Sequence, residues 1–285
     1  MSVKRVGIVG SGIMGSGIAE TAAVHGFEVV LRSRSQSSAD GMVAGMEKSL
    51  NRQVEKEKIA AADAEAALAR VTPTSDLGEL AGCDLVVESV VEDLGVKQHL
   101  FNELDRICGE HTILATNTST LPVVEMAMVT GRPTQVCGIH FFNPAPVMSL
   151  VELVRTITTS DDTLESARAF AAACGKEPVE VKDQAGFVVN ALLFPYLNNA
   201  VRLLEQGVAS MEDIDTAMKG GCGFPMGPFA LLDLVGLDTS LAILDALYAE
   251  YRDPNYAAVP LLRRMVAAEQ LGRKSGTGFY DYHKK

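Results

Sequence analysis

The chain has 285 residues, of which 47% are hydrophobic, enough for about two domains with sizeable cores. Its formal net charge of −11 argues against binding to nucleic acid or to a membrane surface, because both need an extended basic face. The five cysteines are scattered without metal-ligand spacing, which indicates reduced thiols and no metal site. A strand pattern begins at Val3 with no signal peptide before it, and no apolar run is long enough to cross a membrane. We therefore expect a cytoplasmic protein.

A glycine-rich turn separates the first predicted strand from the first predicted helix. Gly10, Gly12 and Gly15 fit the spacing G-x-G-x-x-G, with Ile13 and Met14 opening the helix. In this strand–turn–helix context the spacing is the dinucleotide-binding fingerprint. The first glycine permits the tight turn, the second lets the backbone approach a pyrophosphate, and the third lets the helix pack on the strand. The helix N-terminus then faces the phosphates; a glycine-rich turn without a ligand is the alternative.

The end of the second predicted strand, residues 27–31, bears on the choice of cofactor. In NAD-binding folds an acidic residue about 20 positions after the glycines accepts the ribose hydroxyls. Here the chain has Ser33 and Arg34 instead. A guanidinium group is suited to bidentate contact with a 2′-phosphate, so these residues favour NADP over NAD. A solvated loop with incidental charge is the alternative.

Strand and helix patterns alternate over residues 1–184. An Ala-, Glu- and Lys-rich stretch predicts a long helix or helical pair over 39–69. Further strands are predicted at 85–87, 112–115, 135–142, 150–157 and 178–181, with helices at 96–107 and 164–174. This alternation predicts a doubly wound, mostly parallel α/β sheet, and together with the glycine turn it predicts a Rossmann-type domain that binds NAD(P).

The pattern becomes entirely helical over residues 185–285, which we predict to be a helical domain for substrate binding and dimerisation. Helices are predicted at 187–205, from a cap at Ser210 to 219, at 229–251 and at 260–270, with a Gly/Pro-rich loop at 220–228. These helices carry more apolar surface than so small a bundle can hide. We therefore expect one face to be buried in a homodimer.

A histidine and a glutamate are the main candidates for proton chemistry. His140 ends a predicted strand, and ligands of open α/β sheets bind beyond the carboxyl ends of the strands. Imidazole suits proton transfer to and from an alcohol, although a structural histidine is the alternative. Glu152 lies in the next strand, where alternation buries its carboxylate, and a buried carboxylate needs a partner. We expect Glu152 to fix the tautomer of His140, with the backbone or Arg155 as alternative partners.

Other polar residues occupy positions where a ligand could be bound. Ser119 follows the strand that ends at Ala115, so its hydroxyl can bond the reacting oxygen; a Ser/Thr-rich turn is the alternative. Asn190 lies in the first turn of a long helix, where its amide either reaches a ligand or caps the helix. Arg52 and Lys56 share one helix face, which by itself indicates only a solvated surface.

Taken together, several segments resemble one enzyme family, the short-chain L-3-hydroxyacyl-CoA dehydrogenases, and most of all its bacterial 3-hydroxybutyryl-CoA dehydrogenases. The resemblance spans nearly the whole chain in the right order. The matching segments are residues 10–19, 87–92, 117–119, 140–144, 186–190, 225–228 and 276–280.

This resemblance implies a reversible hydride transfer between NAD(P) and C3 of a short-chain (S)-3-hydroxyacyl-CoA. It implies that His140 is the general acid/base, that Glu152 orients it, and that Ser119 and Asn190 bind the oxygens of the substrate. Arg52 and Lys56 match the basic helix that meets the CoA phosphates, which replaces the solvated-face interpretation. Family positions that contact the cofactor are matched by Glu92, Lys97, Asn117, Ser119, Asn143 and Lys274.

Two other functions are compatible with parts of the sequence. A dehydrogenase of free β-hydroxyacids can have a similar two-domain build, but it is expected to use a lysine base and would not need Arg52 and Lys56. A non-catalytic NAD(P)-binding relative would be expected to have lost the pair of His140 and Glu152, and both residues are present.

Overall fold

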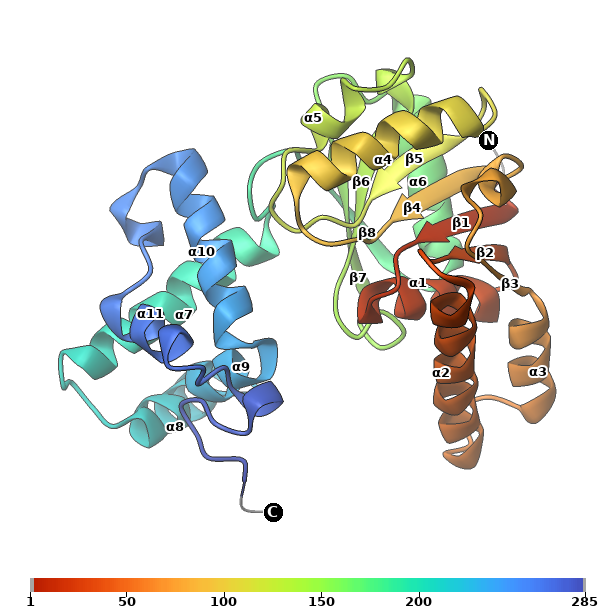
Figure 1. Ribbon diagram of the computed structural model, residues 1–285. Helices are drawn as coiled ribbons and strands as arrows, with labels where there is room; N and C mark the ends of the chain where they lie inside the picture. Colours follow the sequence, from red (N-terminus) through yellow and green to blue (C-terminus); the bar gives the residue numbers. More distant parts are fainter. Residues whose placement is uncertain (1–2, 284–285) are drawn as a thin grey trace. The chain divides into compact units, whose positions relative to one another are not determined.

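The computed structural model describes residues 3–283, which fold into two compact units (Figure 1). The first unit extends to Asp183 and the second begins at Gln184. Each unit has its own hydrophobic core, so each is described by itself. Within residues 3–283, no helix is both long and apolar enough to cross a membrane.

The first unit is built on an eight-stranded sheet with the order β3-β2-β1-β4-β5-β6-β7-β8. Its strands pair in parallel except for β6 and β7, which are antiparallel. The predicted fold class is confirmed. The strands are β1 (Arg5–Val9), β2 (Glu28–Arg32), β3 (Val71–Thr74), β4 (Leu85–Glu88), β5 (Ile113–Thr116), β6 (Val136–Phe141), β7 (Leu150–Arg155) and β8 (Glu177–Lys182).

Helices cover both faces of this sheet. The core under one face joins side chains from α1, α2, α3 and α6, whereas α4 lies across the opposite face, as Figure 1 shows. The helices of this unit are α1 (Ile13–Val24), α2 (Gln36–Glu55), α3 (Ala61–Ala69), α4 (Leu94–Ile107), α5 (Val123–Ala127) and α6 (Asp161–Ala173), with short 3₁₀ turns η1 (Leu77–Leu80) and η2 (Pro133–Gln135). The predicted helical pair is therefore α2 and α3.

Two elements of the first unit were not predicted. The edge strand β3 contains Pro73, which weakens a strand pattern in sequence but is tolerated at an edge because one side of an edge strand needs no ladder bonds. Helix α5 has only five residues and follows Pro122, so it is too short to show a helical period.

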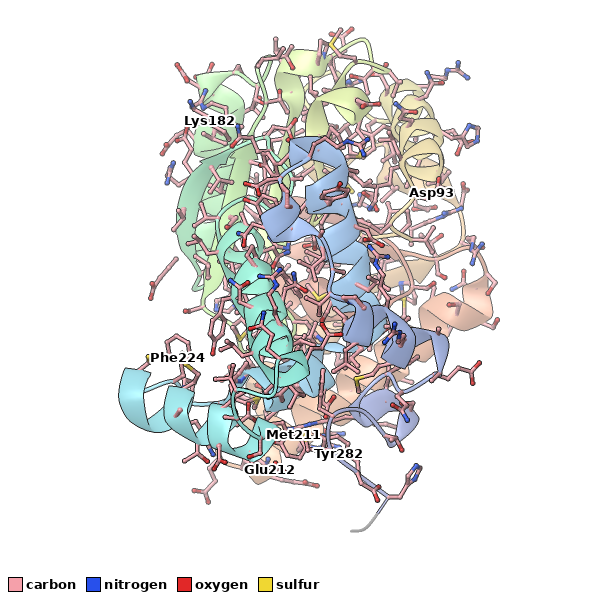
Figure 2. The ribbon with its side chains drawn as sticks, turned by 90° about the vertical axis from the view of Figure 1, so that its left-hand side faces the viewer. Asp93, Lys182, Met211, Glu212, Phe224 and Tyr282 are labelled. Carbon is pink, nitrogen blue, oxygen red and sulfur yellow. The ribbon has the colours of Figure 1, made fainter. Side chains whose placement is uncertain are left out.

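The second unit is all-helical. Its core gathers apolar side chains around Phe194, Phe229 and Leu244. Figure 2 marks Met211, at the start of α8, and Phe224, just past its end. Ser210 caps α8 by accepting a hydrogen bond from the backbone N–H of Asp213, as predicted. The helices are α7 (Val189–Glu205), α8 (Met211–Cys222), α9 (Pro228–Val235), α10 (Leu237–Tyr251) and α11 (Pro260–Ala267), with the 3₁₀ turns η3 (Pro254–Tyr256) and η4 (Arg273–Ser275).

Two predicted boundaries in the second unit were wrong. The single helix predicted over 229–251 is broken at Gly236, whose φ of +101° is accessible to glycine and rarely to other residues. The loop predicted over 220–228 is shorter, because α8 continues to Cys222 before Gly223 ends it in the left-handed conformation.

Candidate active site

The register of two antiparallel strands brings His140 and Glu152 together. They are direct cross-strand partners in β6 and β7. Nδ1 of His140 lies 2.8 Å from Oε2 of Glu152, and the two residues are 4% and 1% exposed. Arg155, the alternative partner of Glu152, instead binds Glu180 and Asp161. A buried carboxylate at Nδ1 fixes the tautomer of the imidazole and stabilises its protonated form.

The other ring nitrogen of His140 faces the loop after β5. Nε2 of His140 lies 3.0 Å from Oγ of Ser119. The neighbouring Asn117 ties this loop to β6, because its side-chain oxygen accepts the backbone N–H of Phe141 at 2.8 Å. The ring of Phe142 lies against the imidazole, with centroids 4.6 Å apart. The structure therefore forms a continuous chain from Glu152 through His140 to Ser119 at the carboxyl edge of the sheet.

Glu92 and Lys97 lie in the same region, joined by a residue that the sequence analysis did not single out. Nζ of Lys97 is 2.7 Å from Oε1 of Glu88 and 3.3 Å from Oε2 of Glu92. Lys97 and Glu88 are 1% and 0% exposed. Partial burial alone would raise the pKa of Glu92, but Lys97 and hydrogen bonds from Thr118 and Ser119 hold that pKa below its usual value. The signal for Glu88 in sequence was a charged residue ending the apolar run of β4.

The glycine-rich turn has the shape that a dinucleotide phosphate requires. A Cβ on Gly10 would lie 2.1 Å from the carbonyl oxygen of Ser89, and one on Gly15 would lie 2.5 Å from that of Gly10. A Cβ on Gly12, by contrast, would meet nothing within 4 Å. The N-terminus of α1 has neither a side-chain cap nor an acidic residue in its first turn. Close packing behind the turn and open space before an uncapped helix end fit a bound pyrophosphate.

A pocket of about 540 Å³ adjoins this turn at the end of β2. Ser33 and Arg34 line it from one side, and His99 and Glu103 of α4 also line it. Ser33 is buried, and its Oγ has no hydrogen-bond partner within residues 3–283; the same holds for Nε of Arg32. Burial lowers the pKa of the Arg32 guanidinium. Donor groups left unpaired at a pocket wall are available to a ligand.

A second pocket of the first unit, of about 600 Å³, lies between α1, α2 and the loop after β6. Asn143 and Ile13 line this pocket rather than the one at the end of β2. Ser49 of α2 also lines it, one turn from the exposed Arg52 and two turns from the exposed Lys56. The structure thus places the two predicted basic residues at the end of α2, close to a pocket.

The second unit carries two of the predicted site residues. Asn190 lies in the first turn of α7 and is 8% exposed. Lys274 in η4 forms an ion pair with Asp238 at 2.5 Å. A pocket of about 480 Å³ in this unit is lined by Glu212 and Tyr282, which lie near each other in Figure 2. In the part of the chain described here, no cluster of three or more His, Cys, Asp or Glu side chains has a metal-binding arrangement.

Comparison with known proteins matches both units to one family. Residues 5–184 match the model of the 3-hydroxyacyl-CoA dehydrogenase NAD binding domain, and residues 186–282 match the model of the 3-hydroxyacyl-CoA dehydrogenase C-terminal domain. The 3-hydroxybutyryl-CoA dehydrogenase of Clostridioides difficile is 47% identical over 98% of this chain and 100% of its own length. The human mitochondrial hydroxyacyl-coenzyme A dehydrogenase is 46% identical over 98% of this chain and 91% of its own.

Solved structures agree with these matches. The crystal structure of Mycobacterium tuberculosis FadB2 has a TM-score of 0.97 at 46% identity, covering 99% of this chain and 100% of that one. The (S)-3-hydroxybutyryl-CoA dehydrogenase PaaH1 from Ralstonia eutropha has a TM-score of 0.96 at 45% identity, with the same coverage. These matches confirm the resemblance seen in sequence and favour it over the free-acid and non-catalytic alternatives. The chain is an oxidoreductase with an NAD-binding domain, and it belongs to the 3-hydroxyacyl-CoA dehydrogenase family.

Proposed function

We propose that the chain interconverts (S)-3-hydroxybutyryl-CoA and acetoacetyl-CoA by reversible hydride transfer between NAD(P) and C3 of the acyl group. The observation that carries this proposal is the chain of contacts from Glu152 through His140 to Ser119 at the carboxyl edge of the sheet. It offers a proton carrier next to a hydroxyl group, which is what the oxidation of an alcohol or the reduction of a ketone requires.

The side chains act as follows. In reduction, protonated His140 gives its Nε2 proton to the oxygen forming at C3, and in oxidation the neutral ring takes a proton from the hydroxyl. Glu152 stabilises the protonated ring through Nδ1, and Ser119 holds the reacting oxygen beside Nε2. We assign Asn190 to the substrate oxygens as well, on the family match alone. When bound, the nicotinamide supplies or accepts the hydride.

Most of the residues that we assign to the cofactor lie in the first unit, and Lys274 lies in the second. The glycine turn at Gly10, Gly12, Ile13, Met14 and Gly15 would hold the pyrophosphate, and we assign Glu92, Lys97, Asn117, Ser119, Asn143 and Lys274 to cofactor binding by family position. We further propose that NADP is preferred over NAD. Ser33 and Arg34 stand where an acidic residue would exclude a 2′-phosphate, and the unpaired Ser33 Oγ offers a donor there. A kcat/KM ratio favouring NADH over NADPH would refute this preference.

The CoA moiety is assigned to α2. Arg52 and Lys56 supply positive charge in a chain whose net charge is −11, so they can attract a polyanion that the rest of the surface repels. The adjoining pocket of about 600 Å³ is large enough for part of such a ligand.

We also propose a homodimer formed through the helical unit, working in a reducing compartment such as the cytoplasm. Leu192 on α7 is 72% exposed, and Leu203 and Phe224 are 42% and 41% exposed, so apolar surface remains to be covered. All five cysteines are free thiols. A monomer in light scattering at micromolar concentration would refute the dimer.

The proposed activity is tested by following the nicotinamide absorbance band with acetoacetyl-CoA, free acetoacetate and longer 3-oxoacyl-CoAs, each with NADH and NADPH. We expect turnover with acetoacetyl-CoA and little with the free acid. Higher activity on the free acid would favour the free-acid dehydrogenase, and no turnover with any substrate would favour a non-catalytic cofactor-binding protein.

A further inference from the structure

A buried charge cluster, Glu88 and Lys97 with the adjoining Glu92, lies next to the loop after β5 that carries Ser119. The side chains of Glu88 and Lys97 are fully enclosed, and their charged groups are 2.7 Å apart. Glu88 also accepts the hydroxyl of Thr116 at 2.7 Å and the backbone N–H of Val90 at 2.5 Å. These contacts fix Lys97 at the end of β4.

Glu92 connects Lys97 to the loop after β5, residues 117–122. One carboxylate oxygen lies 3.3 Å from Nζ of Lys97. The other accepts the hydroxyl of Thr118 at 2.5 Å and the backbone N–H groups of Ser119 and Thr120 at 3.0 and 3.3 Å. A single carboxylate oxygen therefore accepts hydrogen bonds from three consecutive residues of the loop, including the serine that contacts His140.

An ionised carboxylate is required for this arrangement. A protonated carboxyl group accepts weaker hydrogen bonds and becomes a donor itself, so it would no longer hold the N–H of Ser119 as firmly. Around Glu92, the charged or titratable groups are Lys97 on α4, Glu88 on β4, and Asp93, whose carboxylate caps α4 (Figure 2). His140 on β6 contacts Ser119 through Nε2. Of these, Lys97 alone is a cation in direct contact with Glu92.

We propose that Lys97, anchored by Glu88, is a positioning residue that keeps Glu92 ionised and thereby holds Ser119 in place against His140. This inference rests on the proposed function, because it assigns a role to residues behind the same reacting centre. It gives Lys97 a role beyond the cofactor contact assigned by family position, because the ammonium is buried and engaged by two carboxylates. Replacing a buried ion pair by neutral side chains is often neutral for stability, so positioning is the more specific role for the pair.

The test compares two variants that differ only at Lys97. Glu88→Gln leaves the ammonium paired with Glu92, whereas Glu88→Gln/Lys97→Met removes it without leaving a bare charge at Glu88. The readout is kcat for the reduction of acetoacetyl-CoA as a function of pH. The pH at which kcat falls on the acidic side of this profile is expected to stay the same or decrease in the single variant, and to increase by about one unit in the double variant. The pH midpoint at which the Ser119 amide chemical shift changes, measured by NMR without cofactor, is expected to rise in the double variant as well.

Two further variants complete the design. Adding Glu92→Gln to the double variant should abolish the shift, because a glutamine oxygen still accepts the Ser119 N–H but does not titrate. Arg132→Met, which breaks an ion pair with Asp105 near the amino end of β6, should lower stability without changing the acidic pH at which kcat falls.

If kcat falls at the same acidic pH in Glu88→Gln and in Glu88→Gln/Lys97→Met, the inference is overturned. A change confined to the KM of the cofactor would also overturn it, because it would indicate that Lys97 acts only by direct contact with the cofactor. Failure of the proposed function is distinguishable, because the wild-type protein would then show no turnover while the amide titration could still be measured.

Discussion

The carboxylate of Glu152 offers a sensitive test of the proposed proton chemistry. Substituting Glu152 by Gln preserves the shape of a side chain that is 1% exposed but removes the charge 2.8 Å from Nδ1 of His140. A hydrogen bond to a charged group contributes about 1.5–3 kcal/mol to the state in which that charge exists. Because the imidazole is protonated in only one state of the cycle, the loss falls on the proton-transfer step.

That loss corresponds to about a 10- to 150-fold fall in kcat. The assay is steady-state turnover of acetoacetyl-CoA with the cofactor saturating. Asp105→Asn, a carboxylate paired with Arg132 near the amino end of β6, is the matched control and should leave kcat unchanged. Wild-type kcat in Glu152→Gln would refute the reasoning.

Three further predictions concern the cofactor, the CoA group and stability. Arg34→Ala should lower kcat/KM for NADPH by about 10- to 100-fold while changing that for NADH little, because it removes a charge-assisted contact to the 2′-phosphate; equal losses with both cofactors would contradict this. Arg52→Ala and Lys56→Ala should each raise the KM for acyl-CoA about two- to fivefold without lowering kcat, and added salt should shrink the effect; an unchanged KM at low salt would contradict this. Burial raises the pKa of Glu20, although hydrogen bonds from Ser49 and Gln53 partly oppose this effect. Because the pKa is higher in the folded state, the free energy of unfolding falls as pH rises above the pKa that Glu20 has in the unfolded chain. Glu20→Gln, whose amide oxygen can accept both bonds, should therefore raise the thermal midpoint by about 2–4 °C at pH 7 and not at pH 4; an equal effect at both pH values would count against this assignment.

The parts of the fold that follow from local rules could be predicted from sequence. The glycine turn, the alternating strands and helices and the switch to an all-helical pattern each have a residue-level signal. Elements whose stability comes from their neighbours could not be predicted. Strand β3 forms because its backbone pairs with the edge of β2. The apolar pattern over residues 229–251 is continuous in sequence, but the chain turns at Gly236 and forms two helices.

In the candidate site, too, some contacts could be predicted from sequence and others could not. The pairing of His140 with Glu152 could be anticipated, because strand alternation buries the glutamate and a buried carboxylate needs a partner. The cluster of Glu88, Lys97 and Glu92 could not, since it depends on how β4, α4 and the loop after β5 meet in space. The pocket at the end of β2 likewise includes His99 and Glu103, which lie far from Ser33 in sequence.

The central claim, that His140 carries the proton, is tested most directly by measuring kcat of His140→Gln with acetoacetyl-CoA at saturating cofactor. The account predicts a fall on the order of 10²- to 10⁴-fold, with the dissociation constant of the cofactor unchanged. Turnover at the wild-type rate would contradict it.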